Sequence, residues 1–253
     1  SSNNFPVIEH PVPGFWGLVE DLPGFIQRHQ SMKHKLTSLP RFERTAAAAL
    51  ALLSTGGLSQ AALTLKYTFN DISGTTVPNT APGATINGTL TTGGSVAPIV
   101  ENGGTVVVGG LTYNLGSVVR FAPPGDNSAD ANTPYIQTGG SLSLWGITGG
   151  TPYTAMAWVK FNNQTNDNMI FGDLSGNRLH LGSRGGSYHS GHWGDDVGGG
   201  TTQPGVWHHV AYTNDSGNNQ TIYVDGVAVA GPASNGTGGL ENGDNVVLGT
   251  SGN

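Results

Sequence analysis

The sequence contains no cysteine, and charged residues occupy only 10% of its 253 positions. Without cysteine, the chain can form neither a disulfide framework nor a thiolate metal site. It has 10 Lys and Arg residues and 16 Asp and Glu residues, which gives a formal net charge of −6. Binding to nucleic acid or to anionic lipid needs a basic face. We therefore expect no nucleic-acid partner and no attraction to anionic membranes.

Helix-forming patterns are also scarce after the first 60 positions, whereas glycine is abundant, with 41 residues in the chain. Thr, Asn, Val and Ser are frequent as well, and no long segment rich in Leu, Glu and Lys occurs there. This composition suits many short strands joined by turns. It predicts an all-β domain.

Residues 32–61 have the three-part form of a secretory signal peptide. A basic stretch precedes the apolar run Ala46–Leu53, and the small-residue site Ser59–Ala61 follows it. The run covers eight residues, far fewer than the ~20 that span a bilayer as a helix. We expect cleavage after Ala61 and a secreted, extracellular or cell-surface product. The alternative is a short surface helix of a cytoplasmic protein.

Residues 1–31 are rich in proline, lack a clear period and do not begin with Met. We interpret them as non-domain sequence upstream of a start at Met32. The predicted mature domain is 62–253.

Alternating apolar and polar residues predict strands through this domain. The clearest is Leu63–Asn70, in which Leu63, Leu65, Tyr67 and Phe69 share one face. Thr105–Val108 and Leu111–Tyr113 are expected to form a hairpin around Gly109 and Gly110. Further strands are predicted at 117–121, 135–137, 153–161, 169–171, 179–181 and 246–249.

A hairpin at Val206–Thr213 and Thr221–Val224 is the most informative stretch, and Asp225-Gly226 predicts a tight turn into a third strand, Val227–Ala230. The pattern Trp-His-His-Val-Ala-Tyr followed by Ile-Tyr-Val-Asp-Gly-Val resembles the concanavalin A-like jelly rolls, in particular the laminin-G-like domains of bacterial surface proteins. The resemblance implies a two-sheet antiparallel jelly-roll sandwich. The family's final strand, which lies beside the first, has no counterpart before Asn253, so we expect a fragment at both ends.

Hydrolases share this architecture, and glycoside hydrolysis needs two carboxylates about 5–9.5 Å apart. In the related glucanases these are Glu residues at alternating positions of one strand. The predicted domain holds only Glu101 and Glu241, far apart in the chain. The motifs of acyl transfer, nucleotide binding and zinc proteolysis are also absent. We expect no catalytic residues and no enzymatic activity in this chain.

The segment 185–196 is the predicted ligand site, interpreted as a glycine-rich loop. Tyr and Trp rings with nearby His and Asp groups suit a sugar, whose rings have apolar faces and a polar rim. The candidate residues are Tyr188, His189, His192, Trp193, Asp195 and Asp196. The alternatives are that Trp193 packs into the domain and that the carboxylates are ordinary solvated charges.

Two kinds of metal site are conceivable. His189 and His192, completed by His180 or Asp195, are possible ligands of a transition metal. The family resemblance instead implies Ca²⁺ at Asp71, with Asn70 and Ser73; the alternative there is an ordinary Asx turn.

The expected function is a secreted, non-catalytic, carbohydrate-binding (lectin-like) domain of a cell-surface or extracellular protein, with a polysaccharide or glycan as partner. The alternatives are an adhesion or structural module that binds a surface protein, and a polysaccharide-degrading enzyme or its accessory domain. No membrane insertion of the mature domain is expected.

Overall fold

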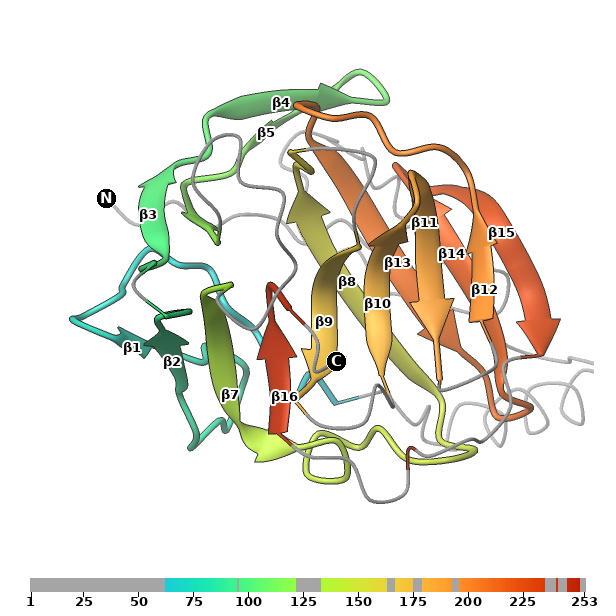
Figure 1. Cartoon of the computed structure of the whole chain (residues 1–253), viewed down its shortest axis with the longest axis horizontal. Coiled ribbons are helices and arrows are strands. Elements are labelled where there is room, and N and C mark those ends of the chain that lie inside the picture. The colour runs from blue at the N-terminus through green and yellow to red at the C-terminus, as the bar shows by residue number, and fades with distance from the viewer. Residues whose placement is uncertain are drawn as a thin grey trace, which may run out of the picture. The chain divides into compact units, whose positions relative to one another are not determined.

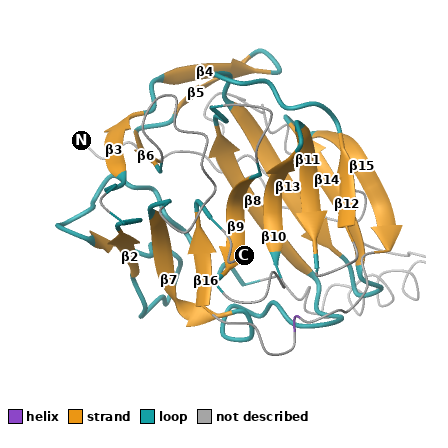
Figure 2. Ribbon diagram, viewed as in Figure 1, coloured by secondary structure: helices purple, strands orange, loops and turns teal. Residues whose placement is uncertain are grey.

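A computed structural model of the chain describes residues 62–94, 96–121, 133–162, 167–174, 179–192, 196–234, 240 and 245–250. Antiparallel strands are the regular secondary structure of these residues. No α-helix occurs among these residues (Figure 2). Among the same residues, no helix long and apolar enough to cross a membrane is found. The predicted upstream sequence and signal peptide, residues 1–61, lie outside the described residues.

Two sheets hold most of the strands (Figure 1). The eight-stranded sheet has, in spatial order, β1 (Thr76–Val77), β2 (Gly88–Thr91), β7 (Tyr135–Ser141), β16 (Asn245–Leu248), β9 (Asn168–Asp173), β10 (His180–Arg184), β11 (Ser187–Gly191) and β12 (Asp196–Gly199). The four-stranded sheet has the order β15 (Val227–Ser234), β14 (Asn219–Val224), β13 (His208–Asn214) and β8 (Tyr153–Val159). Two small pairs complete the set: β3 (Ile99–Asn102) with β6 (Ser117–Arg120), and β4 (Thr105–Val108) with β5 (Leu111–Asn114).

The core lies between the two large sheets. Val210, Tyr212 and Ile222 of the four-stranded sheet are fully buried and belong to one cluster with Leu181 and Tyr188 of the other. The Tyr212 hydroxyl crosses the core and donates to the Gly182 carbonyl at 2.8 Å. Burying these apolar faces against each other is the main driving force for the two-layer arrangement. The predicted all-β antiparallel sandwich is confirmed.

The hairpin β13–β14–β15 has the expected form. Val210 pairs with Val224 and Tyr212 with Ile222, so these four side chains share the core face. Asp225 and Gly226 both have positive φ, 51° and 81°, as a tight two-residue turn requires. The Asp225 carboxylate also accepts the His209 amide at 2.9 Å and lies 2.7 Å from His208 Nδ1.

The predicted strand Leu63–Asn70 is wrong, since the structure assigns no strand there. Asn79 holds this segment instead: its Oδ1 accepts the Lys66 amide at 2.9 Å, and its side-chain amide donates to the Thr64 carbonyl at 3.1 Å. Phe69 has φ of +60°, which ends the extended conformation. Tyr67 and Phe69 do pack against the cluster around Val77. The alternation in sequence therefore reflects the packing of Tyr67 and Phe69, not the hydrogen-bonded pairing of a strand.

The segment 185–196 is also not a continuous glycine-rich loop. Within its described residues, 185–192 and 196, Gly185 and Gly186, both with positive φ, form the turn. They connect β10 to β11, and β11 pairs in turn with β12. The sequence pattern failed here because Gly191, Gly198 and Gly199 occupy strand positions, which glycine usually disfavours.

Candidate functional site

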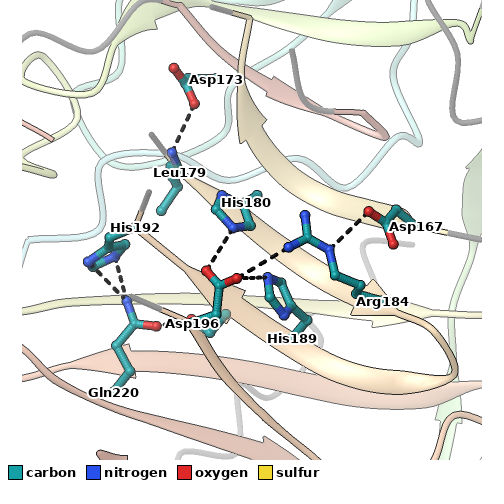
Figure 3. Close-up of polar contacts among 10 residues, drawn as sticks. Asp167, Asp173, Leu179, His180, Arg184, His189, His192, Asp196 and Gln220 are labelled. Carbon is teal, nitrogen blue, oxygen red and sulfur yellow. Dashed lines mark hydrogen bonds and ion pairs between the residues drawn. The ribbon is translucent and has the colours of Figure 1, made fainter. Parts of the chain in front are cut away.

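The predicted ligand segment lies on β10, β11 and β12, where strand alternation sorts its side chains onto two faces. Gly182 pairs with His189, and Gly191 pairs with both His180 and Asp196. This register places His180, His189 and Asp196 on the face opposite Leu181 and Tyr188, which pack in the core. Figure 3 shows the two imidazoles and Arg184 around the Asp196 carboxylate.

A charged network joins these groups. His180 Nε2 lies 3.1 Å from Asp196 Oδ1, and His189 Nε2 lies 3.8 Å from Asp196 Oδ2. Arg184 donates from Nη1 to Asp196 Oδ2 at 3.2 Å and from Nε to Asp167 Oδ2 at 3.0 Å. The imidazoles are buried, whereas the side chains of Arg184 and Asp196 are 44% and 40% exposed. The network can therefore be reached from solvent on its Asp196 side.

His189 is electrostatically distinct. Burial lowers its pKa to about 4, although the nearby Asp196 charge acts in the opposite direction. Its imidazole is consequently neutral at pH 7. A neutral imidazole can accept a hydrogen bond or bind a metal ion.

The structure places Tyr188 and His192 on the core side, away from this network. Tyr188 is 2% exposed and packs against Phe161 with ring centroids 6.0 Å apart. His192 is fully buried, with Nε2 2.6 Å from the Tyr153 hydroxyl and Gln220 as a further partner. The expectation that Tyr188 and His192 present open surfaces to a ligand is corrected, because strand pairing turns them into the sandwich.

The predicted site residues are thus only partly brought together. His189 and Asp196 converge, and His180 joins them as weighed from the sequence. Trp193 and Asp195 lie outside the described residues. Arg184 and Asp167 were missed; the Gly185-Gly186 turn was the available signal for Arg184, because it implies a β10–β11 hairpin that sets Arg184 near the later residues.

A second surface was also missed. On the four-stranded sheet, Trp158 pairs with His209, and Met156 with Ala211. Ala211 pairs in turn with Tyr223. All point away from the core-facing Val210 and Tyr212. We call the side chains of Tyr113, Met156, Trp158, His209 and Tyr223 the aromatic face.

The aromatic face carries rings in tilted and edge-on contact, with neighbouring hydroxyl groups. The Trp158 ring lies 5.0 Å from the Tyr113 ring of β5 and 5.4 Å from the His209 ring. Met156 is 56% exposed beside them. The next cross-strand pair, Thr154 and Thr213, adds hydroxyl groups to the same face. Alternation in β8 and β13 was the sequence signal for this surface.

The predicted calcium residues lie in a turn before β1. Asn70 Oδ1 accepts the Ser117 amide at 2.9 Å, and the backbone groups of Ser73 pair with Thr76. Asp71 is exposed. Asp71 is therefore the one charged ligand that these three residues offer, and the calcium site stays a prediction.

An open polar hollow of about 440 Å³ lies beside Asn70 and is lined by β3 residues from Val100 to Asn102 and by Asn114, Gly116 and Ser117. Its polar groups already hold the backbone: Asn102 and Asn114 each accept an amide two residues later. Glu101 pairs with Arg120 at 3.3 Å. The hollow is thus built from groups that fix its own turns.

The family model described as the Concanavalin A-like lectin/glucanases superfamily matches residues 130–253. This range includes β7 to β16 and both candidate surfaces except Tyr113. No curated protein matches the chain.

Proposed function

Because residues 130–253 belong to the concanavalin A-like lectin/glucanase superfamily, we propose that this lectin-like domain binds carbohydrate without catalysis. The superfamily supports a lectin-like role in general. The aromatic face is the observation that carries the specific proposal.

Sugar rings have an apolar face of C–H groups and a rim of hydroxyl groups, so their binding sites combine flat rings with directional polar groups. The aromatic face offers this combination. The Trp158 ring contacts the rings of both Tyr113 and His209, which fixes its orientation before a ligand arrives. Preorganised side chains lose little conformational entropy on binding. Thr154 and Thr213 form the next cross-strand pair on this face after Met156 and Ala211, and they supply hydroxyl groups.

The non-catalytic part of the proposal rests on the carboxylates. Glu101 is paired with Arg120, and Asp167 and Asp196 share Arg184. Glycoside hydrolysis needs two carboxylates that face one bond, whereas each of these carboxylates is held in an ion pair with an arginine. Reducing-sugar release from polysaccharides is expected to be absent; sustained release would favour the hydrolase alternative.

The binding test uses the full chain on a glycan array, with Trp158→Ala and Tyr223→Ala as variants. Each removes a ring of the aromatic face, and we expect affinity for the bound glycans to fall about five- to tenfold, equivalent to about 1–1.4 kcal/mol. Tyr135→Ala is the matched control, because Tyr135 is a half-buried tyrosine of β7 outside this face. Equal affinity in all three variants would contradict the assignment of this face.

Met156 favours the second candidate, an adhesion module that binds protein. A methionine that is 56% exposed beside aromatic rings suits a protein interface, where methionine and aromatic residues are enriched. Absence of glycan binding, together with capture of a surface protein that Trp158→Ala abolishes, would replace the carbohydrate proposal by this one.

We propose further that the domain is secreted, on the basis of the basic, apolar and small-residue order of residues 32–61. N-terminal sequencing of the secreted product is expected to begin at Ala62. A mature chain that begins before Met32 would contradict this proposal. Calcium at Asp71 remains a proposal from the family resemblance, and a melting temperature unchanged by millimolar Ca²⁺ would count against it.

A further inference from the structure

We propose that His180, His189 and Asp196 form a binding site for a divalent transition-metal ion such as Zn²⁺ on the eight-stranded sheet. One ligand atom from each residue lies within 4.8 Å of the other two. The three residues come from three neighbouring strands, β10, β11 and β12, and their register fixes them on one face. Ligands on paired strands are held more rigidly than ligands on loops.

The strongest indication of a metal site is a buried, unpartnered ring nitrogen of His189. Its side chain is 7% exposed, and its Nε2 atom is buried without a hydrogen-bond partner. The 3.8 Å to Asp196 Oδ2 is too long for a hydrogen bond. A buried polar atom without a partner costs about 1–3 kcal/mol. A metal ion bound between the imidazoles and the carboxylate would satisfy this atom.

The absence of a side chain at Gly191 allows His180 and Asp196 to approach each other. Gly191 lies between His180 and Asp196 in the register of β10, β11 and β12. A Cβ atom at this position would overlap His180 Nε2 and lie 2.5 Å from Asp196 Oδ1. Any larger residue at position 191 would therefore separate these two ligand atoms. The approach of His180 to Asp196 depends on the absence of a side chain here.

The Arg184 guanidinium would compete with a metal ion for the Asp196 carboxylate. Its Nη1 holds Asp196 Oδ2 at 3.2 Å, while its Nε holds Asp167 Oδ2 at 3.0 Å. The Arg184 side chain is 44% exposed, so it can leave Asp196 and keep Asp167. A divalent ion bound to Asp196 would repel the guanidinium and replace it.

The donor set selects the class of metal. Two imidazoles and one carboxylate suit Zn²⁺ and neighbouring transition metals, whereas Ca²⁺ and Mg²⁺ prefer oxygen ligands alone. With three protein ligands, the fourth position is left for water or for a ligand group. The His208–Asp225 pair, at 2.7 Å, belongs to no group of three such ligands among the described residues and serves as an internal comparison.

The experiment is calorimetric titration of ZnCl₂ into the full chain after dialysis against a chelator, with Co²⁺ absorption as a second readout. We expect a site of one-to-one stoichiometry whose affinity falls at least about tenfold in His189→Gln and in Asp196→Asn. His208→Gln is the matched control and is expected to keep wild-type affinity. Arg184→Gln removes the competing cation and is expected to bind Zn²⁺ more tightly than wild type.

Unchanged affinity in both His189→Gln and Asp196→Asn would overturn the proposal, as would the absence of stoichiometric binding to the wild type. Circular dichroism checks folding of each variant. If the buried His189→Gln variant does not fold, the Asp196→Asn variant decides, because the Asp196 side chain is 40% exposed and its replacement leaves the core intact. The outcome is independent of glycan binding, since the aromatic face is formed by the four-stranded sheet and Tyr113 of β5, not by β10, β11 and β12.

Discussion

At the residue scale, Tyr188 shows how a side chain that appears suited to a ligand can serve the core. It was expected to offer a flat face to sugar, yet it packs with Phe161 and meets the His208 ring edge-on. Its hydroxyl is buried without a hydrogen-bond partner. Burial, assisted by the Asp225 charge, raises the pKa of Tyr188 to about 12. The free energy of unfolding therefore depends on pH above the ordinary pKa of tyrosine.

The Tyr188→Phe variant tests this. At pH 7 the loss of an unpaired hydroxyl is expected to leave stability unchanged or raise it by about 1 kcal/mol. Above pH 10, tyrosine ionises in the unfolded chain while Tyr188 stays neutral in the fold, so the free energy of unfolding falls as the pH rises from 10 towards 12. Tyr67, whose pKa burial also raises to about 12, adds to this loss.

Urea unfolding at pH 8 and pH 11 measures the difference. We expect wild-type stability to fall over this interval and Tyr188→Phe to lose less. If both proteins lose the same free energy of unfolding, the burial of an unionised Tyr188 is contradicted.

At the element scale, the sheet β9–β12 depends on glycines where neighbouring strands approach closely. Gly182 lies at the bulge where the β9–β10 register shifts. A Cβ atom there would overlap the Asn168 carbonyl oxygen and lie 2.7 Å from Met169 Cα. These are backbone atoms, which cannot turn away as a side chain could. Gly198 of β12, by contrast, would meet only the Tyr188 carbonyl, at 3.4 Å.

The pair Gly182→Ala and Gly198→Ala isolates this effect. Gly182→Ala is expected to cost about 1–3 kcal/mol, because the clash moves the β9 backbone. Gly198→Ala is expected to stay within about 0.5 kcal/mol of wild type. Thermal unfolding measures both, with about 2–4 °C of melting temperature per kcal/mol for a domain of this size. Similar losses in the two variants would contradict a specific role for Gly182.

The same strands show where sequence patterns work and where they fail. Alternation located β13 and β14, because a strand with one buried face must alternate, and the structure buries Val210 and Tyr212 of that face in the core. It failed at Leu63–Asn70, where apolar and polar residues alternate in sequence but the backbone pairs with the Asn79 side chain. It failed again at β11 and β12, whose glycines resemble a loop.

At the scale of the whole molecule, short sequence patterns were enough to predict the sandwich and the superfamily. They were not enough to predict the metal-binding cluster or the aromatic face. The Trp207 to Gly226 segment carries the hairpin that identifies the fold. Convergence of His180, His189 and Asp196 depends on the register of three strands, and one residue of slip would send His189 into the core. The aromatic face likewise needs Tyr113, more than 40 residues before Trp158 in sequence, to meet the sheet.

Glycan binding by this domain is the central claim, and its most direct test is the glycan array with the full chain, wild type beside Trp158→Ala. The proposal predicts binding of a defined group of glycans by the wild type and a five- to tenfold weaker affinity, about 1–1.4 kcal/mol, in the variant. A wild-type chain that binds no glycan on the array, or a variant that binds as tightly as the wild type, would contradict it.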